Sequence, residues 1–107
     1  MVRDYRFTGG FDVALDICET LSMSASTELT DAQKDIFLRF SCSAASKVLT
    51  LGLEDGQFMV VANVGASNAV TVKNIAADTG TSVAAGKVAL CIGGSSTADT
   101  FKCYVLN

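Results

Sequence analysis

The chain has 107 residues, of which 50% are hydrophobic and 18% charged. This length predicts one domain around a single hydrophobic core, and so many apolar side chains with so little charge exclude intrinsic disorder. The net charge of −3, with 8 basic residues scattered along the chain, predicts no nucleic-acid partner, because phosphate binding needs a clustered basic surface.

The first ten residues are predicted to form an extended N-terminal arm. Arg3, Tyr5 and Phe7 stand at every second position and so share one face, and Gly9-Gly10 provides a hinge. Extended arms commonly add to the sheet edge of a partner. We therefore predict that Arg3, Tyr5, Phe7 and the following Phe11 contact a partner. The alternative is a first strand folded onto the chain's own sheet or a frayed terminus.

Apolar and polar residues alternate from Phe11 to Cys18, which predicts a half-buried strand. Thr20–Thr30 is rich in serine and threonine and is interpreted as a loop. Thr30 and Gln33 have the spacing of a capping box, which predicts one turn of helix after Thr30.

From Ile36 onwards, short apolar segments alternate with glycine-bearing turns. Gln57–Ala62 is almost entirely apolar, which predicts a central strand covered on both faces. Asn63–Asn68 has the composition of a hairpin loop, so the next strand is expected to return beside it. The strands predicted in this region span residues 36–40, 47–53 (with Leu49, Leu51 and Leu53 on one face), 57–62, 69–74, 88–92 and 101–106.

Together these elements predict an all-β fold. We expect a single small β-sandwich of seven to eight strands, jelly-roll-like or with another Greek-key order, with an extended N-terminal arm. A closed barrel is the other architecture that such spacing fits. The expected division is an N-terminal arm over residues 1–10 and a β-sandwich domain over residues 11–107.

The composition also narrows the chemistry. The sequence has no histidine, so it lacks the usual general base near neutral pH and the commonest metal ligand. This composition removes most familiar catalytic constellations without excluding an enzyme, so that no catalytic residue stands out, and we expect no cofactor and no metal site. The remaining enzymatic interpretation is a small hydrolase with two carboxylates facing each other across strands, for which Asp16 and Glu19 are candidates.

The N-terminus carries charges among its apolar residues, and the longest apolar stretch, Phe58–Ala62, is far shorter than the ~20 residues of a spanning helix. We expect a soluble protein made in the cytosol, without a signal peptide or a membrane partner. The cysteines form no Cys-x-x-Cys pair and are interpreted as buried, reduced thiols: Cys18, Cys42, Cys91 and Cys103. A Cys91–Cys103 bridge is the alternative, disfavoured by a reducing cytosol.

The second half of the chain resembles a known group of proteins. The likeness extends from Val48 to Asn107 and is carried by Val48-Leu49-Thr50-Leu51, by residues 55–65, by Asn68–Lys73 and by residues 83–90. In order, these segments are similar to the strands and glycine turns of tailed-bacteriophage structural proteins: capsid decoration (cement) proteins, head fibres and tail-fibre modules. Such modules often close with Asp-Gly-Thr and a tryptophan, where this chain has Gly94-Ser95-Ser96-Thr97 followed by Phe101 and Tyr104.

The resemblance implies a virion structural protein without catalysis, made in the bacterial host cytoplasm and located on the capsid surface. The size of the chain favours a capsid decoration protein, which implies the major capsid protein as partner and a homo-oligomer, trimer or dimer. Many repeated contacts over a shell clamp neighbouring subunits against the pressure of internal DNA. The alternative is a trimeric head- or tail-fibre module that binds a host receptor or a saccharide, which the lack of tryptophan disfavours.

Overall fold

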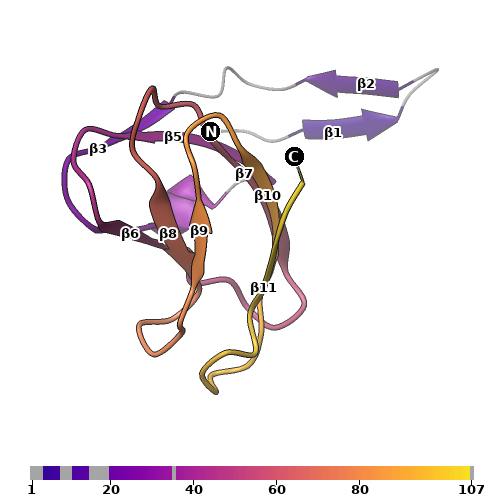
Figure 1. Cartoon of the computed structure of the whole chain (residues 1–107). Coiled ribbons are helices and arrows are strands. Elements are labelled where there is room, and N and C mark those ends of the chain that lie inside the picture. Colours follow the sequence, from indigo (N-terminus) through magenta and orange to yellow (C-terminus); the bar gives the residue numbers. More distant parts are fainter. Residues whose placement is uncertain (1–3, 8–10, 15–19, 35, 107) are drawn as a thin grey trace.

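The computed structural model describes residues 4–7, 11–14, 20–34 and 36–106. In this part of the chain two sheets pack face to face, which confirms the predicted all-β sandwich (Figure 1). The five-stranded sheet contains, in spatial order, β11 (Lys102–Val105), β10 (Val88–Ile92), β7 (Phe58–Asn63), β5 (Phe37–Cys42) and β3 (Thr20–Met23). The four-stranded sheet contains β4 (Thr27–Glu28), β6 (Lys47–Thr50), β8 (Val70–Lys73) and β9 (Thr81–Val83).

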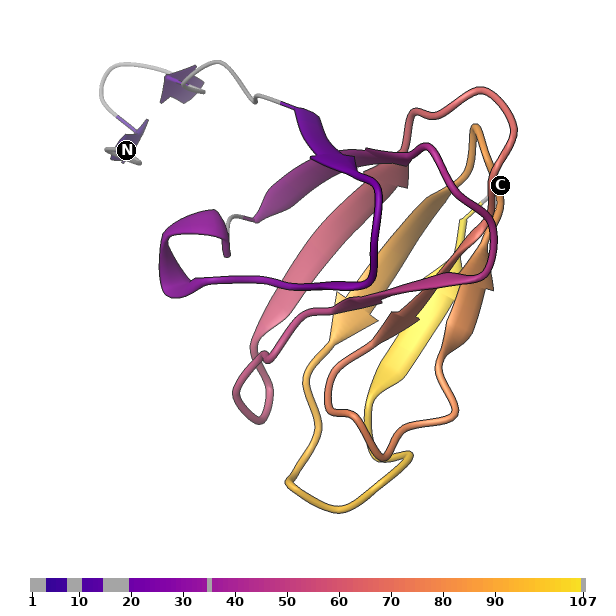
Figure 2. The ribbon, with the colours of Figure 1, turned by 90° about the vertical axis from the view of Figure 1, so that its left-hand side faces the viewer.

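Within that class, the strand order differs from a purely antiparallel jelly roll or Greek key. From β3 to β8 the chain crosses between the sheets at every connection, so that β3, β5 and β7 are parallel neighbours, as are β4, β6 and β8 (Figure 2). The direction then reverses: β9 is antiparallel to β8, β10 to β7 and β11 to β10. Parallel and antiparallel strands share the same period of two, so the sequence pattern does not distinguish them.

Two early segments fold differently from the prediction. β3 and β4 lie in the segment interpreted as a loop, and β9 lies where no strand is predicted, so the sandwich has nine strands among the described residues rather than seven or eight, although the predicted strand at Phe11 is not one of them. β3 and β4 are edge strands of four and two residues, and so short a stretch of alternation does not stand out in a segment rich in serine and threonine. The residues after β7 also do not form a hairpin, because β7 and β8 belong to different sheets.

The N-terminal residues form a separate two-stranded sheet. β1 (Asp4–Phe7) pairs antiparallel with β2 (Phe11–Ala14), and the pair projects beyond the sandwich (Figure 1). The strand predicted to begin the sandwich at Phe11 is therefore wrong in its partner: it pairs with the arm. The residues predicted to continue that strand, 15–18, lie outside the described residues.

The core lies between the two sheets and follows the predicted alternation. Leu49, Leu51 and Leu53, which share one face in the sequence, are all buried. In β10 the inward positions are Ala89 and Cys91. The other fully buried large side chains come from β5, β7, β8 and β9: Phe40, Met59, Val61, Val70, Val72 and Val83.

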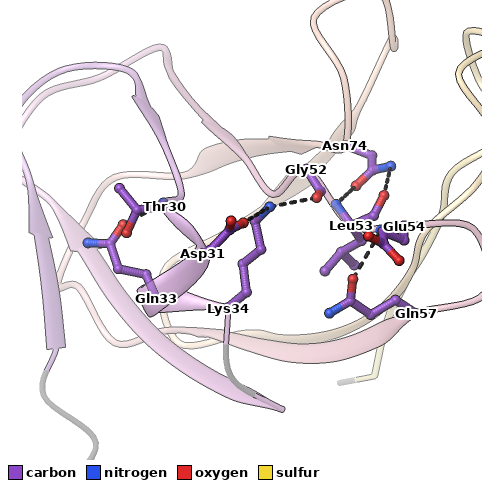
Figure 3. A network of polar contacts seen from close by, with 9 residues as sticks. All are labelled: Thr30, Asp31, Gln33, Lys34, Gly52, Leu53, Glu54, Gln57 and Asn74. Atoms are coloured by element: carbon purple, nitrogen blue, oxygen red, sulfur yellow. Dashed lines mark hydrogen bonds and ion pairs between the residues drawn. The ribbon is translucent and has the colours of Figure 1, made fainter. Parts of the chain in front are cut away.

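The single helical turn, η1 (Asp31–Gln33), follows Thr30 as the capping box predicts. The side-chain oxygen of Gln33 accepts the backbone N–H of Thr30 at 2.9 Å, and the backbone oxygen of Thr30 accepts the N–H of Gln33. The neighbouring Lys34 then holds the turn against the sandwich: its Nζ donates to the Gly52 carbonyl at 2.8 Å and pairs with Asp31 at 3.1 Å (Figure 3).

One end of the sandwich is closed by a buried amide. The Asn74 side chain accepts the backbone N–H of Leu53 at 2.6 Å and donates to the Leu53 carbonyl at 3.0 Å (Figure 3). Asn74 thereby replaces the strand pairing that ends with β6, because Leu53 is buried and its backbone groups need partners.

The same end holds a buried carboxylate. Asp78 accepts the backbone N–H groups of Asn74, Ile75 and Asp99, at 3.0, 3.0 and 2.8 Å. Asp99 in turn accepts the backbone N–H of Thr79 at 2.7 Å. These bonds tie the loop between β8 and β9 to the loop between β10 and β11.

The opposite end is closed by Asn63, also buried. Its Nδ2 donates to the carbonyls of Asn68 and Val83, both at 2.9 Å, and its Oδ1 accepts the N–H of Gly65 at 3.0 Å. Both ends of the sandwich are therefore held by polar side chains that take over where strand pairing stops.

Candidate partner-binding surface

The outer face of the five-stranded sheet carries apolar side chains in rows that run across neighbouring strands. The strand register places Phe37, Val60, Leu90 and Tyr104 side by side in one row. A second row contains Phe58 and Ile92, with Lys102 at its end. A third contains Ala62, Val88 and Leu106, with Arg39 at its other end.

We define the outer apolar face as the large members of these rows on β5, β7, β10 and β11, with the residue directly after β11: Phe37, Phe58, Val60, Val88, Leu90, Ile92, Tyr104 and Leu106. Three of these side chains are strongly exposed, Phe58 at 53%, Tyr104 at 53% and Leu106 at 58%. The others are half-buried, and the described charges around them are Arg39 and Lys102 at opposite sides. Contiguous apolar surface of this kind marks an interaction site on a folded protein.

The outer face of the four-stranded sheet has the opposite character. Register places Val48, Thr71 and Ser82 in one row and Glu28, Thr50 and Lys73 in the next. A sheet with one face on the core normally presents such polar residues to water. The contrast between the two sheets identifies the five-stranded sheet as the one suited to a protein partner.

The sequence carried a signal for this surface that was interpreted differently. The nearly continuous apolar segment at β7 predicted a strand covered on both faces. Its central position, third of five, is confirmed. The covering of both faces is wrong for Phe58, because the four-stranded sheet covers one face only and this ring is 53% exposed.

The residues predicted to contact a partner lie in the N-terminal two-stranded sheet, apart from Arg3, which falls outside the described residues. Phe7 stands directly opposite Phe11, and Tyr5 opposite Val13. The register thus brings together three positions that the sequence analysis singled out, although it placed Phe11 in the sandwich. None of these residues belongs to the outer apolar face.

The described titratable groups have structural surroundings. Burial opposes the ionisation of Asp78, but its backbone hydrogen bonds and the nearby Lys73 outweigh that effect and hold its pKa below the usual value. Its carboxylate oxygens are engaged with the loops that they join. In the part of the chain that the structure describes, no three His, Cys, Asp or Glu side chains are placed to hold a metal ion. Asp16 and Glu19 lie outside the described residues.

The described cysteines are free thiols, and the interpretation as reduced thiols is confirmed for Cys42, Cys91 and Cys103. Cys42 and Cys91 are buried as predicted, whereas Cys103 is half-buried because β11 is an edge strand. Cys18 lies outside the described residues.

Among the helices that the structure describes, none is long and apolar enough to cross a membrane. No known protein family, curated protein or solved structure matches the chain.

Proposed function

We propose that the protein is a virion structural protein that decorates the outside of a phage capsid and stabilises it by binding the major capsid protein. The observation that carries the proposal is the outer apolar face, set against the polar outer face of the other sheet. The resemblance of residues 48–107 to phage decoration and fibre modules supports the same assignment and names the partner. A rigid small sandwich with one apolar face suits a protein that binds a preformed shell, since little ordering accompanies docking.

The aromatic rings are expected to dominate this contact. Interface hot spots are enriched in aromatic residues that become fully buried. Phe58 and Tyr104 are each about half exposed, which leaves roughly 100 Å² per ring to be covered. At about 25 cal/mol per Å², covering one ring contributes ~2.5 kcal/mol, or about seventyfold in Kd.

The test is co-sedimentation of the purified chain with expanded capsid shells of the virus that carries its gene. Phe58→Ser and Tyr104→Ser should each weaken binding by about seventyfold. Val64→Ser is the matched control, because Val64 is similarly exposed, at 46%, but lies in the loop after β7. Equal binding by the three variants would remove the outer apolar face from the contact. An unmodified chain that does not bind shells would overturn the decoration function.

The N-terminal two-stranded sheet is a second contact in this proposal. A chain lacking residues 1–10 loses β1, which pairs only with β2 among the described strands. The sandwich should keep its unfolding midpoint while shell binding weakens. Unchanged binding by the shortened chain would restrict the contact to the sandwich.

Light scattering and saccharide binding, measured beside co-sedimentation, separate the alternative function from decoration. A trimeric fibre module that binds a receptor or saccharide predicts a trimer at every dilution in light scattering. It also predicts saccharide binding that Phe58→Ser or Tyr104→Ser abolishes, without binding to shells. A trimer that also binds shells would fit the decoration function and not the fibre module.

A further inference from the structure

Two thiols face each other across the edge of the five-stranded sheet. Cys91 on β10 and Cys103 on β11 are direct partners in the antiparallel register, and their Sγ atoms are 3.3 Å apart. A disulfide requires about 2.05 Å, so the sulfur atoms need to approach by only about 1.2 Å.

The backbone at this pair has the spacing that a cross-strand disulfide accepts. The N–H of Leu106 donates to the carbonyl of its direct partner Val88, which makes that pair a hydrogen-bonded one. Hydrogen-bonded and non-hydrogen-bonded pairs alternate along antiparallel strands, so Cys91 and Cys103 occupy a non-hydrogen-bonded pair. The Cα atoms of such a pair are about 4.5 Å apart, at the short end of the range found in disulfides.

The two thiols also differ in pKa and access. The hydrogen bond between them holds the pKa of Cys103 below its usual value, against its partial burial and with help from the Thr81 side chain. The same bond raises the pKa of Cys91, and burial adds to the effect. Cys103 is half-buried on the edge strand, whereas Cys91 is fully buried.

We propose that Cys91 and Cys103 form a thiol–disulfide exchange site that a low-molecular-weight disulfide such as glutathione disulfide oxidises to a cross-strand bond. The Cys103 thiolate attacks one sulfur of the reagent; a mixed disulfide forms, and the first small thiolate leaves with the electron pair. Cys91 then loses its proton to solvent and attacks the Cys103 sulfur, and the second small thiolate leaves and is protonated. Two protein thiols are oxidised and one small disulfide is reduced to two thiols.

The consequence is a covalent connection of an edge strand to its sheet. β11 pairs only with β10 among the described strands; it carries Tyr104 of the outer apolar face, and Leu106 of that face follows it directly. The bond closes a short loop, since the two cysteines are 12 positions apart, and loop closure stabilises the folded state. This inference rests on the inner face of the sheet and does not depend on the proposed function.

The experiment follows oxidation of the 107-residue chain by glutathione disulfide, with each thiol located by alkylation and peptide mass mapping. A Cys18→Ser background retains the three thiols that the structure describes. In this Cys18→Ser parent, the Cys91–Cys103 bond should form while Cys42 stays reduced. Cys91→Ala should stop at a glutathione adduct on Cys103, and Cys103→Ala should react at least about tenfold more slowly at Cys91. Cys42→Ala is the control and should oxidise as the parent does.

Two results overturn the proposal. One is a parent chain in which Cys103 gains a stable glutathione adduct that Cys91 never displaces. The other is a folded parent chain in which Cys103 reacts no faster than the buried Cys42. Since both are measured on folded chain with its three described thiols intact, they decide the matter even if an alanine variant does not fold.

Discussion

Asn74 provides the sharpest test of how the sandwich is closed at one end. In Asn74→Ala the backbone N–H and carbonyl of Leu53 lose the side chain that satisfies both. Leu53 is 5% exposed, so water does not readily replace these bonds. An unsatisfied buried polar group costs about 1–3 kcal/mol, and the two groups together predict a loss of about 2–6 kcal/mol in the free energy of unfolding.

The assay is urea unfolding followed by far-ultraviolet circular dichroism, with Asn68→Ala as the matched control. Asn68 is half-buried, and its Nδ2 donates a hydrogen bond to a residue distant in the sequence, the Cys42 carbonyl at 2.9 Å. A typical net loss for one such bond is about 1 kcal/mol. Asn74→Ala should lower the midpoint by at least twice the shift of the control, with an unchanged slope. Equal shifts in the two variants would refute the argument that Asn74 replaces strand pairing.

Two further predictions concern the same end of the molecule. Asp78 has a lowered pKa in the folded chain, so its stabilising effect is complete above the pKa of the unfolded chain and is lost as the pH falls through the lower pKa of the folded chain. At pH values below about 4, the urea midpoint of the parent should therefore decrease and converge towards that of Asp78→Asn. Parallel pH curves for the two proteins would contradict this prediction. Gly93→Ala places a Cβ against the Glu54 carbonyl and the Leu53 side chain and should lower the free energy of unfolding by about 1–3 kcal/mol. The loss should exceed that of Gly56→Ala, where the Cβ meets open space and only the positive φ of 81° opposes the substitution. An equal or smaller loss at Gly93, measured by the same urea unfolding, would show that the loop moves aside.

The sandwich was predictable from sequence because its core strands alternate plainly. Leu49, Leu51 and Leu53 share a face and are buried, as their spacing predicts. The capping box likewise predicted η1 from Thr30 and Gln33 alone, since all its contacts are local. Structural features that depend only on residues close together in the sequence can therefore be predicted from the sequence.

Strand order was not accessible in the same way. The pairing of β5 with β7 joins Phe37 to Val60, across a connection that passes through the other sheet. Such a pairing is decided by how rows of side chains fill the space between the sheets, and period-two alternation carries no trace of it. The loop after β7 looked like a hairpin for this reason: Asn63 and Gly65 suit a tight turn, but Asn63 instead uses its side chain to close the sandwich.

The candidate surface shows a second limit of sequence reasoning. Val88, Leu90 and Ile92 alternate with Ala89 and Cys91, and either set has the composition of a core face. The structure buries the smaller set between the two sheets. The larger side chains are left on the outer apolar face, where only three-dimensional placement identifies them as surface.

In the proposed capsid contact, the area of that surface limits how strongly one copy binds. Its three most exposed members, Phe58, Tyr104 and Leu106, are about half exposed and together leave roughly 300 Å² of side chain in water. A standard interface buries about 800 Å² on each partner, so the outer apolar face can form the centre of a contact but not the whole of it. Further area must come from a flanking surface or from additional copies. A repeating shell supplies such copies, and linked weak contacts then hold where a single one exchanges rapidly. The size of the face therefore favours a partner that presents many equivalent sites over one that presents a single site.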